Sequence, residues 1–336
     1  MPLIHQPPVI CYVAAKSGGH IMPALTLAQR EKSRDASTRI LFISSSCELD
    51  KKILKEADYI DKKVTLPLYT PSMSAGFFKY FHLLFGVMAS FFKSLLFFWQ
   101  EKPRHLVSMG GMISVPVCFA AMILRIPFDI WELNAVPGKA VMALKSFART
   151  IYICFSSSNQ ILQSTNVQLA TYPTRFNTKL DNDEARLKLG IPQDKKVLLV
   201  LGGSQGSSFM NHALADMILE IVDNSWFVIH QAGHKEYEMV KEKYAQASID
   251  AYVFNFTSDL AACYTAADFV VARAGAGSIF EILTFNKKAL LIPLHASTTD
   301  HQVDNAKAIV NEYPQFFEYT EQNIVDRARL RKFIDV

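Results

Sequence analysis

Short apolar runs alternate along the chain with longer segments whose apolar residues recur at helical spacing. Residues 9–15, 39–43 and 106–108 form runs that are typical of buried strands. Helical spacing follows through Leu27 and near 49–56. Because this alternation is the pattern of βαβ units, it predicts parallel sheets covered by helices.

The pattern falls into two series separated by a polar stretch at 177–184. The first series continues with runs at 128–131 and 150–155, and the runs of the second are 197–201, 226–231, 251–254, 269–272 and 289–292. A length of 336 residues with 50% hydrophobic composition is enough for two cores. We therefore expect an α/β protein with two doubly wound, Rossmann-like domains, 1–172 and 173–336, facing an interdomain cleft where ligands bind beyond the carboxyl ends of the strands.

Composition and charge narrow the class of protein. The formal net charge is +4, and no basic stretch carries interleaved aromatic residues, which argues against nucleic-acid binding. The five cysteines lie mostly in apolar stretches without C-x-x-C spacing, as expected for reduced core thiols. The first residues lack the basic n-region of a secretory signal, so we expect the protein in the cytoplasm.

Residues 77–99 break the alternation because they are almost continuously apolar. The length would cross a bilayer, but Lys79, His82 and Lys93 interrupt the segment and count against a transmembrane helix. A helix lying in the lipid interface fits better, and a core-facing helix with snorkelling lysines is the alternative. On the favoured interpretation these residues face an anionic membrane surface: Phe77, Phe78, Lys79, Phe81 and Lys93.

Two glycine-rich turns each join a strand to a helix. The first, Ser17-Gly18-Gly19-His20, places an imidazole beside a helix start, and the second is Gly202-Gly203-Ser204-Gln205-Gly206. Helix starts attract phosphate, so both turns are candidate diphosphate sites and His20 is a candidate proton acceptor. Neither turn is the G-x-G-x-x-G of nicotinamide or flavin enzymes, and the second strand ends in Ser44-Ser45-Ser46 rather than an acidic residue.

A third cluster runs from Arg273 to Glu281, after the run 269–272. Its small residues would let a nucleoside lie against the backbone, and Glu281 could accept both ribose hydroxyls or simply stand near a helix start. His295 and His301 lack zinc-site spacing, and Asp181-Asn182-Asp183 is more typical of a helix cap than of a metal site. We therefore expect neither a bound metal nor a cofactor.

Several motifs in this order and spacing resemble the bacterial MurG glycosyltransferase family. They are Ser17-Gly18-Gly19-His20 with Met22-Pro23-Ala24-Leu25, Gly110-Gly111 with Ser114 and Pro116, Glu132-Leu133-Asn134-Ala135-Val136-Pro137-Gly138, Gly202-Gly203-Ser204-Gln205-Gly206, Arg273-Ala274-Gly275-Ala276-Gly277-Ser278-Ile279-Phe280-Glu281, and Asp300-His301-Gln302 with Asn305-Ala306. The resemblance implies the GT-B architecture and transfer of N-acetylglucosamine from UDP-GlcNAc to the 4-hydroxyl of a polyprenyl-diphosphate-linked muramoyl-peptide (lipid I). The product, lipid II, serves peptidoglycan synthesis, and the enzyme would act as a peripheral protein at the cytoplasmic face of the bacterial inner membrane, with cell-wall synthesis or division proteins as further partners.

The resemblance also implies roles for individual residues. His20 would be the base of an inverting transfer, as the residue chemistry independently suggests. Donor contacts would come from Ser17, Gly18, Gly19, Asn134, Arg175, Ser204, Gln205, Thr257, Ala276, Gly277, Ser278, Ile279, Phe280, Glu281 and Gln302, with Arg175 and Ser204 at the diphosphate and Thr257 at uracil. The acceptor side would comprise Lys16, Gly110, Gly111, Ser114 and Glu132.

The departures from the family pattern lie mainly on the acceptor side. Ala14-Ala15-Lys16 stands where the family has more glycines, and Met112, Trp131 and Leu133 replace a Tyr, a His and a Gln. The chain also ends earlier than the family pattern, which leads us to expect weaker domain closure. A related transferase with another lipid acceptor, or a catalytically weak UDP-sugar-binding scaffold for cell-wall enzymes, therefore stays open as an alternative.

Overall fold

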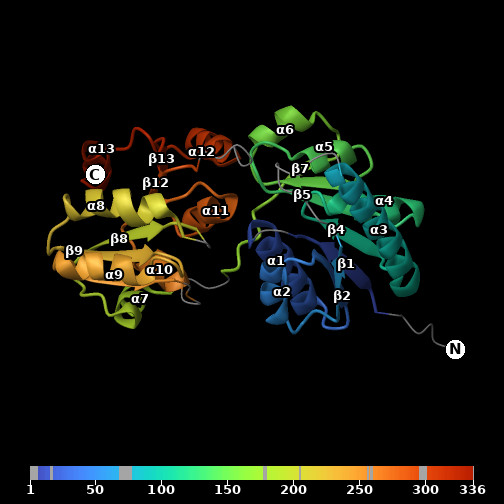
Figure 1. Ribbon diagram of the computed structural model, residues 1–336, viewed down its shortest axis with the longest axis horizontal. Coiled ribbons are helices and arrows are strands. Elements are labelled where there is room, and N and C mark those ends of the chain that lie inside the picture. Colours follow the sequence, from blue (N-terminus) through green and yellow to red (C-terminus); the bar gives the residue numbers. More distant parts are fainter. Residues whose placement is uncertain are drawn as a thin grey trace. The chain divides into compact units, whose positions relative to one another are not determined.

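The computed structural model describes residues 7–15, 18–67, 78–176, 180–203, 206–255, 257, 260–294 and 301–335. The chain divides into two compact units, Met1–Arg175 and Phe176–Val336 (Figure 1). Each unit has one sheet and its own hydrophobic core.

The sheet of the N-terminal unit is parallel, with strand order β3-β2-β1-β4-β5-β6-β7. Its strands are β1 (Val9–Val13), β2 (Arg39–Ser45), β3 (Lys62–Leu66), β4 (His105–Ser108), β5 (Phe128–Glu132), β6 (Thr150–Ile153) and β7 (Val167–Leu169). The order reverses between β1 and β4, where Tyr12 is in register with Val107. In an open parallel sheet, ligands bind beyond the carboxyl ends of the strands at such a reversal.

Helices cover both faces of this sheet (Figure 1). α1 and α2 lie on one face, while α3, α4 and α5 pack with the sheet into one core on the other. The helices of the unit are α1 (Gly18–Arg34), α2 (Glu48–Lys55), α3 (Phe78–Glu101), α4 (Ser114–Ile123), α5 (Lys139–Leu144) and α6 (Ser157–Leu162). The crossover from β3 through α3 to β4 changes the covered face and produces the strand reversal.

The sheet of the C-terminal unit repeats this arrangement, with order β10-β9-β8-β11-β12-β13 and parallel pairing. The strands are β8 (Lys196–Leu201), β9 (Trp226–Gln231), β10 (Ala251–Phe254), β11 (Phe269–Ala272), β12 (Lys288–Leu291) and β13 (Phe317–Tyr319). The strand order reverses between β8 and β11. Every residue of β8 after Lys196 is buried, which explains its continuous apolar run.

The helices of the C-terminal unit are α7 (Asn182–Leu189), α8 (Ala215–Leu219), α9 (Tyr237–Gln246), α10 (Leu260–Ala266), α11 (Ala276–Thr284), α12 (His301–Glu312) and α13 (Arg327–Ile334). A π-helical turn, η1 (Met210–Leu214), leads directly into α8. η1, α8, α9 and α13 share one core with the central strands.

The expected strand–helix alternation is present in both units. Three short strands went unpredicted, namely β3, β7 and β13, because none contains a continuous apolar run. Asp181 caps α7 as the sequence suggested, since its side chain accepts a hydrogen bond from the Asp183 backbone N–H at 3.1 Å. The helix begins at Asn182, two positions before the expected start near Glu184.

Candidate functional site

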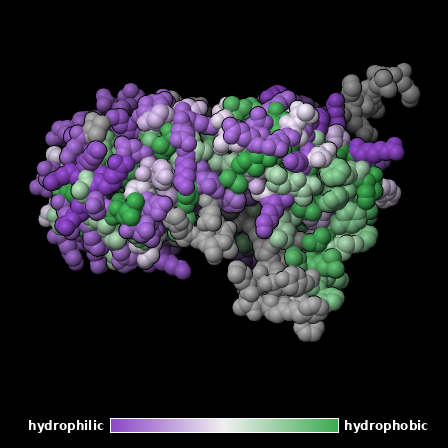
Figure 2. Space-filling view, turned by 90° about the horizontal axis from the view of Figure 1, so that it is seen from above, coloured by the Kyte–Doolittle hydropathy of each residue, from purple (hydrophilic) through white to green (hydrophobic). Residues whose placement is uncertain are grey.

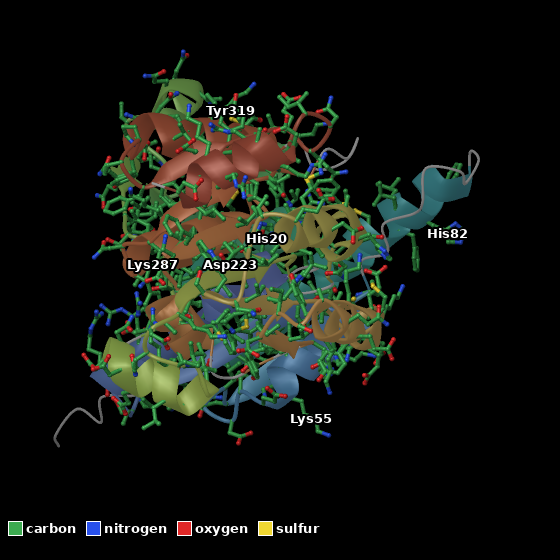
Figure 3. The ribbon with its side chains drawn as sticks, turned by 90° about the vertical axis from the view of Figure 1, so that its left-hand side faces the viewer. His20, Lys55, His82, Asp223, Lys287 and Tyr319 are labelled. Carbon is green, nitrogen blue, oxygen red and sulfur yellow. The ribbon has the colours of Figure 1, made fainter. Side chains whose placement is uncertain are left out.

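His20 lies at the strand reversal of the N-terminal unit, in the first turn of α1 after β1 (Figure 3). Its ring is close to Gly111, which follows β4: a Cβ atom at Gly111 would lie 3.8 Å from Nδ1 of His20. The φ angle of Gly111 is +76°, a conformation that glycine adopts without strain. The paired glycines after β4 and the first turn of α1 are thus brought together at one imidazole.

Serine hydroxyls fix the turn after β4. Ser114 donates from Oγ to the carbonyl oxygen of Gly110 at 2.6 Å, and Ser108 donates to Ser114 Oγ at 2.7 Å. Both hydroxyls are buried, and Gly110 has a φ angle of +73°. Ser114 therefore holds the shape of the glycine turn beside His20 from inside the unit.

Glu132 organises the loop that carries Asn134. Glu132 is only 4% exposed. Its two carboxylate oxygens accept hydrogen bonds from the backbone N–H groups of Asn134 at 2.9 Å and Gly138 at 2.8 Å. Ser158 adds a hydrogen bond from its Oγ to the Asn134 carbonyl at 3.0 Å. Within this unit, Glu132 thus positions the loop of Asn134, for which the family resemblance implies a contact with the transferred sugar.

Some of the expected site residues lie outside the described part of the chain. These are Lys16, Ser17, Phe77, Ser204 and Gln205, and for Phe78 and Lys79 only the helical backbone is described. Gly18 and Gly19 begin α1, and the Tyr172 hydroxyl lies 3.5 Å from the Gly19 carbonyl oxygen. Arg175 is exposed at the end of the N-terminal unit.

In the C-terminal unit, a glycine turn follows β8. A Cβ atom at Gly202 would lie 3.0 Å from the Ser207 nitrogen, and one at Gly206 would lie 2.5 Å from the Ala232 carbonyl oxygen. Gly206 also has a φ angle of +76° and donates from its N–H to the Gly203 carbonyl at 3.0 Å. The turn therefore packs directly against the end of β9, which only glycine allows.

We expect Gly206→Ala to lower the free energy of unfolding by about 3 kcal/mol, because the new Cβ combines a left-handed backbone with a collision against the carbonyl of Ala232. Gly203→Ala is the matched control, since Gly203 has a φ angle of +87° but none of the described residues lies within 4 Å of the added atom. It should cost only about 1 kcal/mol. Urea unfolding of both variants measures the difference, and equal losses would contradict the close packing.

A buried polar network supports this turn from below. The Nδ2 group of Asn211, in η1, donates to the Ala232 carbonyl at 2.8 Å and to Glu236 Oε2 at 2.6 Å. His230 lies 3.1 Å from Asn211 Oδ1 through Nε2 and 2.9 Å from the Tyr244 hydroxyl through Nδ1. Burial lowers the pKa of His230 to about 3, so the ring is neutral. Nε2 then donates to Asn211 and Nδ1 accepts from Tyr244, which fixes the amide that anchors Ala232.

The start of α11 carries the expected nucleoside segment. Gly275 is its N-cap in an extended conformation. Ile279 and Phe280 are buried, whereas Gly277, Ser278 and Glu281 are partly exposed. The Tyr264 hydroxyl on α10 donates to Glu281 Oε2 at 3.0 Å, and the Tyr264 ring stacks on Phe285 with 5.2 Å between centroids. The orientation of Glu281 is thus set by a tyrosine that sequence reasoning missed.

The remaining donor-side candidates also follow strands of this sheet. Thr257 comes after β10, and Gln302 lies in the first turn of α12 after β12. Gln302 Oε1 accepts from the Leu294 backbone N–H at 3.0 Å, and Asn305 donates to the Ala274 carbonyl at 3.4 Å. Because the carboxyl ends of parallel strands share one edge, these groups lie at the same edge as the glycine turn.

Arg273 is a second residue that the sequence analysis did not assign. It follows β11 directly and is 6% exposed. The sequence signal that could have identified it is a charged residue at the end of a mostly buried strand.

The described residues contain no group of three or more His, Cys, Asp or Glu side chains arranged to hold a metal ion.

α3 presents a broad apolar surface on the N-terminal unit. Its inner face packs on the core through buried Ser90, Ser94, Phe97 and Phe98. The outer side chains are exposed, and the apolar surface continues onto α4 and the segment after α5 (Figure 2). This α3 surface comprises Phe81, Leu84, Phe85, Met88, Phe92, Leu96, Trp99, Phe119, Ile123 and Phe147.

By length and composition alone, α3 could cross a membrane, and no other helix in the described ranges could. However, 28% of its most apolar stretch is buried inside the protein. The alternative of a core-facing helix therefore applies to one face of α3. Lys93 is exposed and donates from Nζ to the Thr65 carbonyl at 2.8 Å, while His82 stands near the amino end of the helix (Figure 3).

Comparison with known proteins matches both units to one family. Residues 12–153 match the glycosyltransferase family 28 N-terminal domain, and residues 197–332 match the glycosyltransferase family 28 C-terminal domain. The UDP-N-acetylglucosamine–N-acetylmuramyl-(pentapeptide) pyrophosphoryl-undecaprenol N-acetylglucosamine transferase of Myxococcus xanthus is 30% identical over 297 residues, which is 88% of this chain and 76% of that protein.

Solved structures agree on the fold. Acinetobacter baumannii MurG superimposes with a TM-score of 0.75 at 23% identity, covering 98% of this chain and 90% of that chain. A Medicago truncatula protein crystallised with UDP-glucose superimposes with a TM-score of 0.68 at 14% identity, covering 100% of this chain and 91% of that chain. The expectation of two parallel α/β sheets in the GT-B class is therefore confirmed.

Proposed function

The chain belongs to glycosyltransferase family 28, and from this premise we propose that it transfers N-acetylglucosamine from UDP-GlcNAc to the 4-hydroxyl of a lipid-linked muramoyl-peptide, forming lipid II for peptidoglycan. The observation that carries the proposal is the position of His20, whose ring lies at the strand reversal beside the glycine turn after β4. A general base at this edge is what an acceptor hydroxyl needs in order to become a nucleophile.

In the proposed reaction, the acceptor oxygen attacks the anomeric carbon of the sugar from the face opposite UDP. The bond from that carbon to the acceptor oxygen forms while the bond to the β-phosphate oxygen breaks, and the acceptor proton passes to His20. The configuration at the anomeric carbon is inverted, and UDP leaves with the electron pair. Arg175 and the glycine turn after β8 stabilise the charge that develops on the leaving diphosphate.

The donor is assigned to the C-terminal unit. Its carboxyl edge supplies Glu281 for the ribose hydroxyls and Gln302 for the sugar, with Thr257 at the uracil. The support is that Tyr264 already holds Glu281 in one orientation, so the carboxylate does not have to be ordered when the nucleotide binds. The acceptor is assigned to the N-terminal unit, where Glu132 is the acceptor-side candidate and also holds the loop of Asn134, the residue proposed for the transferred sugar.

Attachment to the cytoplasmic face of the inner membrane is part of the proposal. The α3 surface would lie on the lipid that carries the acceptor, with Lys93 near anionic head groups. Large contiguous apolar surfaces on proteins mark sites of interaction, and a lipid-linked substrate gives this one a partner of matching chemistry.

A turnover assay tests the proposed function. The protein is incubated with UDP-GlcNAc and a short-chain lipid I analogue, and UDP release and the disaccharide product are measured. We expect one UDP per disaccharide formed, with UDP-glucose a poor donor. UDP-GlcNAc binding without turnover on this analogue would reject the muramoyl acceptor and leave the two alternatives, another lipid acceptor or a scaffold.

A further inference from the structure

Two arginines stand out in the C-terminal unit because their guanidinium groups are buried. Arg186 and Arg273 are each only 6% exposed. Nη2 of Arg186 lies 3.2 Å from Oδ2 of Asp268, at the amino ends of β8 and β11. Arg273 lies at the opposite, carboxyl edge, and each acceptor that the described residues offer it is a neutral oxygen. The two sites therefore differ in whether the protein supplies a counter-charge.

The neutral acceptors of Arg273 come from three separate loops at the carboxyl edge. Nη2 donates to Ser207 Oγ at 2.7 Å and to Gln322 Oε1 at 2.8 Å, and Nη1 donates to the Ile292 carbonyl at 3.1 Å. The guanidinium carbon also lies 5.5 Å from the centroid of the Phe209 ring. Arg273 thus joins the turn after β8 to the segments after β12 and β13.

Burial lowers the pKa of Arg273 to about 10, so the side chain is protonated at neutral pH. A buried cation without an anion is costly, and proteins normally pair such charges or neutralise them. The carboxyl edge next to a strand reversal is also where ligands of parallel sheets bind. An anionic ligand at this edge would supply the missing counter-charge.

We propose that Arg273 is a positioning residue for the donor diphosphate: it supplies fixed positive charge to the carboxyl edge and fixes Ser207, which directly follows Gly206 of the glycine turn. This inference rests on the proposed function, because the diphosphate is that of the UDP-sugar. If Arg273 only linked the loops structurally, its hydrogen bonds would be sufficient and its positive charge would not be needed. The test therefore removes the charge.

The experiment compares UDP with uridine, which lacks the diphosphate, by isothermal titration. Arg273→Gln removes the charge while keeping hydrogen-bonding groups, and Arg186→Gln is the matched control at the other edge. We expect Arg273→Gln to weaken UDP binding by about tenfold or more while uridine binding changes by less than about twofold. Arg186→Gln should lower Tm but leave the ratio of UDP to uridine affinity at its wild-type value.

Two further variants keep the test decisive if Arg273→Gln does not fold. Arg273→Lys retains the charge and should keep most of the preference for UDP. Ser207→Ala removes the acceptor that links Arg273 to the glycine turn and should reduce that preference by about threefold to tenfold. An unchanged preference in Ser207→Ala, or its complete loss in Arg273→Lys, would overturn the inference.

The outcomes also separate this inference from the proposed function. If the wild type prefers UDP and Arg273→Gln loses affinity for UDP and uridine equally, or for neither, the role of Arg273 is rejected and the proposed function stands. If the wild type binds UDP no better than uridine, the proposed donor site fails and the inference fails with it.

Discussion

Replacing His20 with alanine should lower kcat by about 10²–10⁴-fold while the KM for UDP-GlcNAc changes by less than about threefold. The imidazole would remove the acceptor proton in the transition state, so its loss should affect the chemical step. Most of the proposed donor contacts that the structure describes belong to the C-terminal unit instead; the exceptions are Gly18, Gly19, Asn134 and Arg175. Steady-state release of UDP with a water-soluble acceptor analogue measures both constants. Added imidazole should restore part of the lost rate, because it can take the proton in place of the missing side chain.

His82→Ala is the matched control, since this exposed histidine is on α3, in the same unit but away from the β1 and β4 turns. Its kcat on the water-soluble analogue should equal that of the wild type. A His20→Ala enzyme that retains more than about a tenth of the wild-type kcat would exclude His20 as the base. Rate loss without imidazole rescue would instead indicate that the residue holds the glycine turn.

Placing two carboxylates on the α3 surface should abolish most membrane binding. Phe85 is 76% exposed and Trp99 is 66% exposed, so both are available for contact with lipid. Burying each aromatic side chain contributes about 1.5–3 kcal/mol, and Phe85→Asp with Trp99→Asp should therefore weaken vesicle binding by about 10²–10⁴-fold. Sedimentation with vesicles that contain phosphatidylglycerol measures the loss.

Leu187→Asp is the control for the membrane experiment. Leu187 is 81% exposed on α7, so it presents a similar apolar side chain from the other unit. This variant should bind vesicles like the wild type, and all three proteins should turn over the water-soluble analogue equally. Undiminished vesicle binding by the double variant would show that the α3 surface faces something other than lipid.

The sequence predicts the two-sheet fold because most strands are continuous apolar runs. β8 and β9 are buried along nearly their whole length, and such strands leave an unmistakable pattern. β3 is an edge strand whose Lys62 and Lys63 are exposed, so it resembles a polar loop in sequence. The three missed strands each have only one neighbour in the sheet, and the fourth such strand, β10, was predicted because its sequence is mostly apolar.

The sequence also predicts part of the candidate site. Residues that follow strands can be assigned to the carboxyl edge from sequence, as for His20 and Glu281, because parallel strands end together. The contacts of Tyr264 with Glu281 and of Arg273 with Gln322 join positions 17 and 49 residues apart, and no local pattern encodes them. The buried carboxylate of Glu132 likewise looks in sequence like an exposed acid.

The parallel pairing of β1 with β4 also constrains how the N-terminal unit is made. Cys11 is in register with Leu106, so β1 waits during synthesis for a partner strand encoded far downstream. Meanwhile one edge of an apolar strand stays unsatisfied, and closing so long a loop is slow. That edge of β1 stays open until β4 emerges, and the glycine turn beside His20 forms only after that late step.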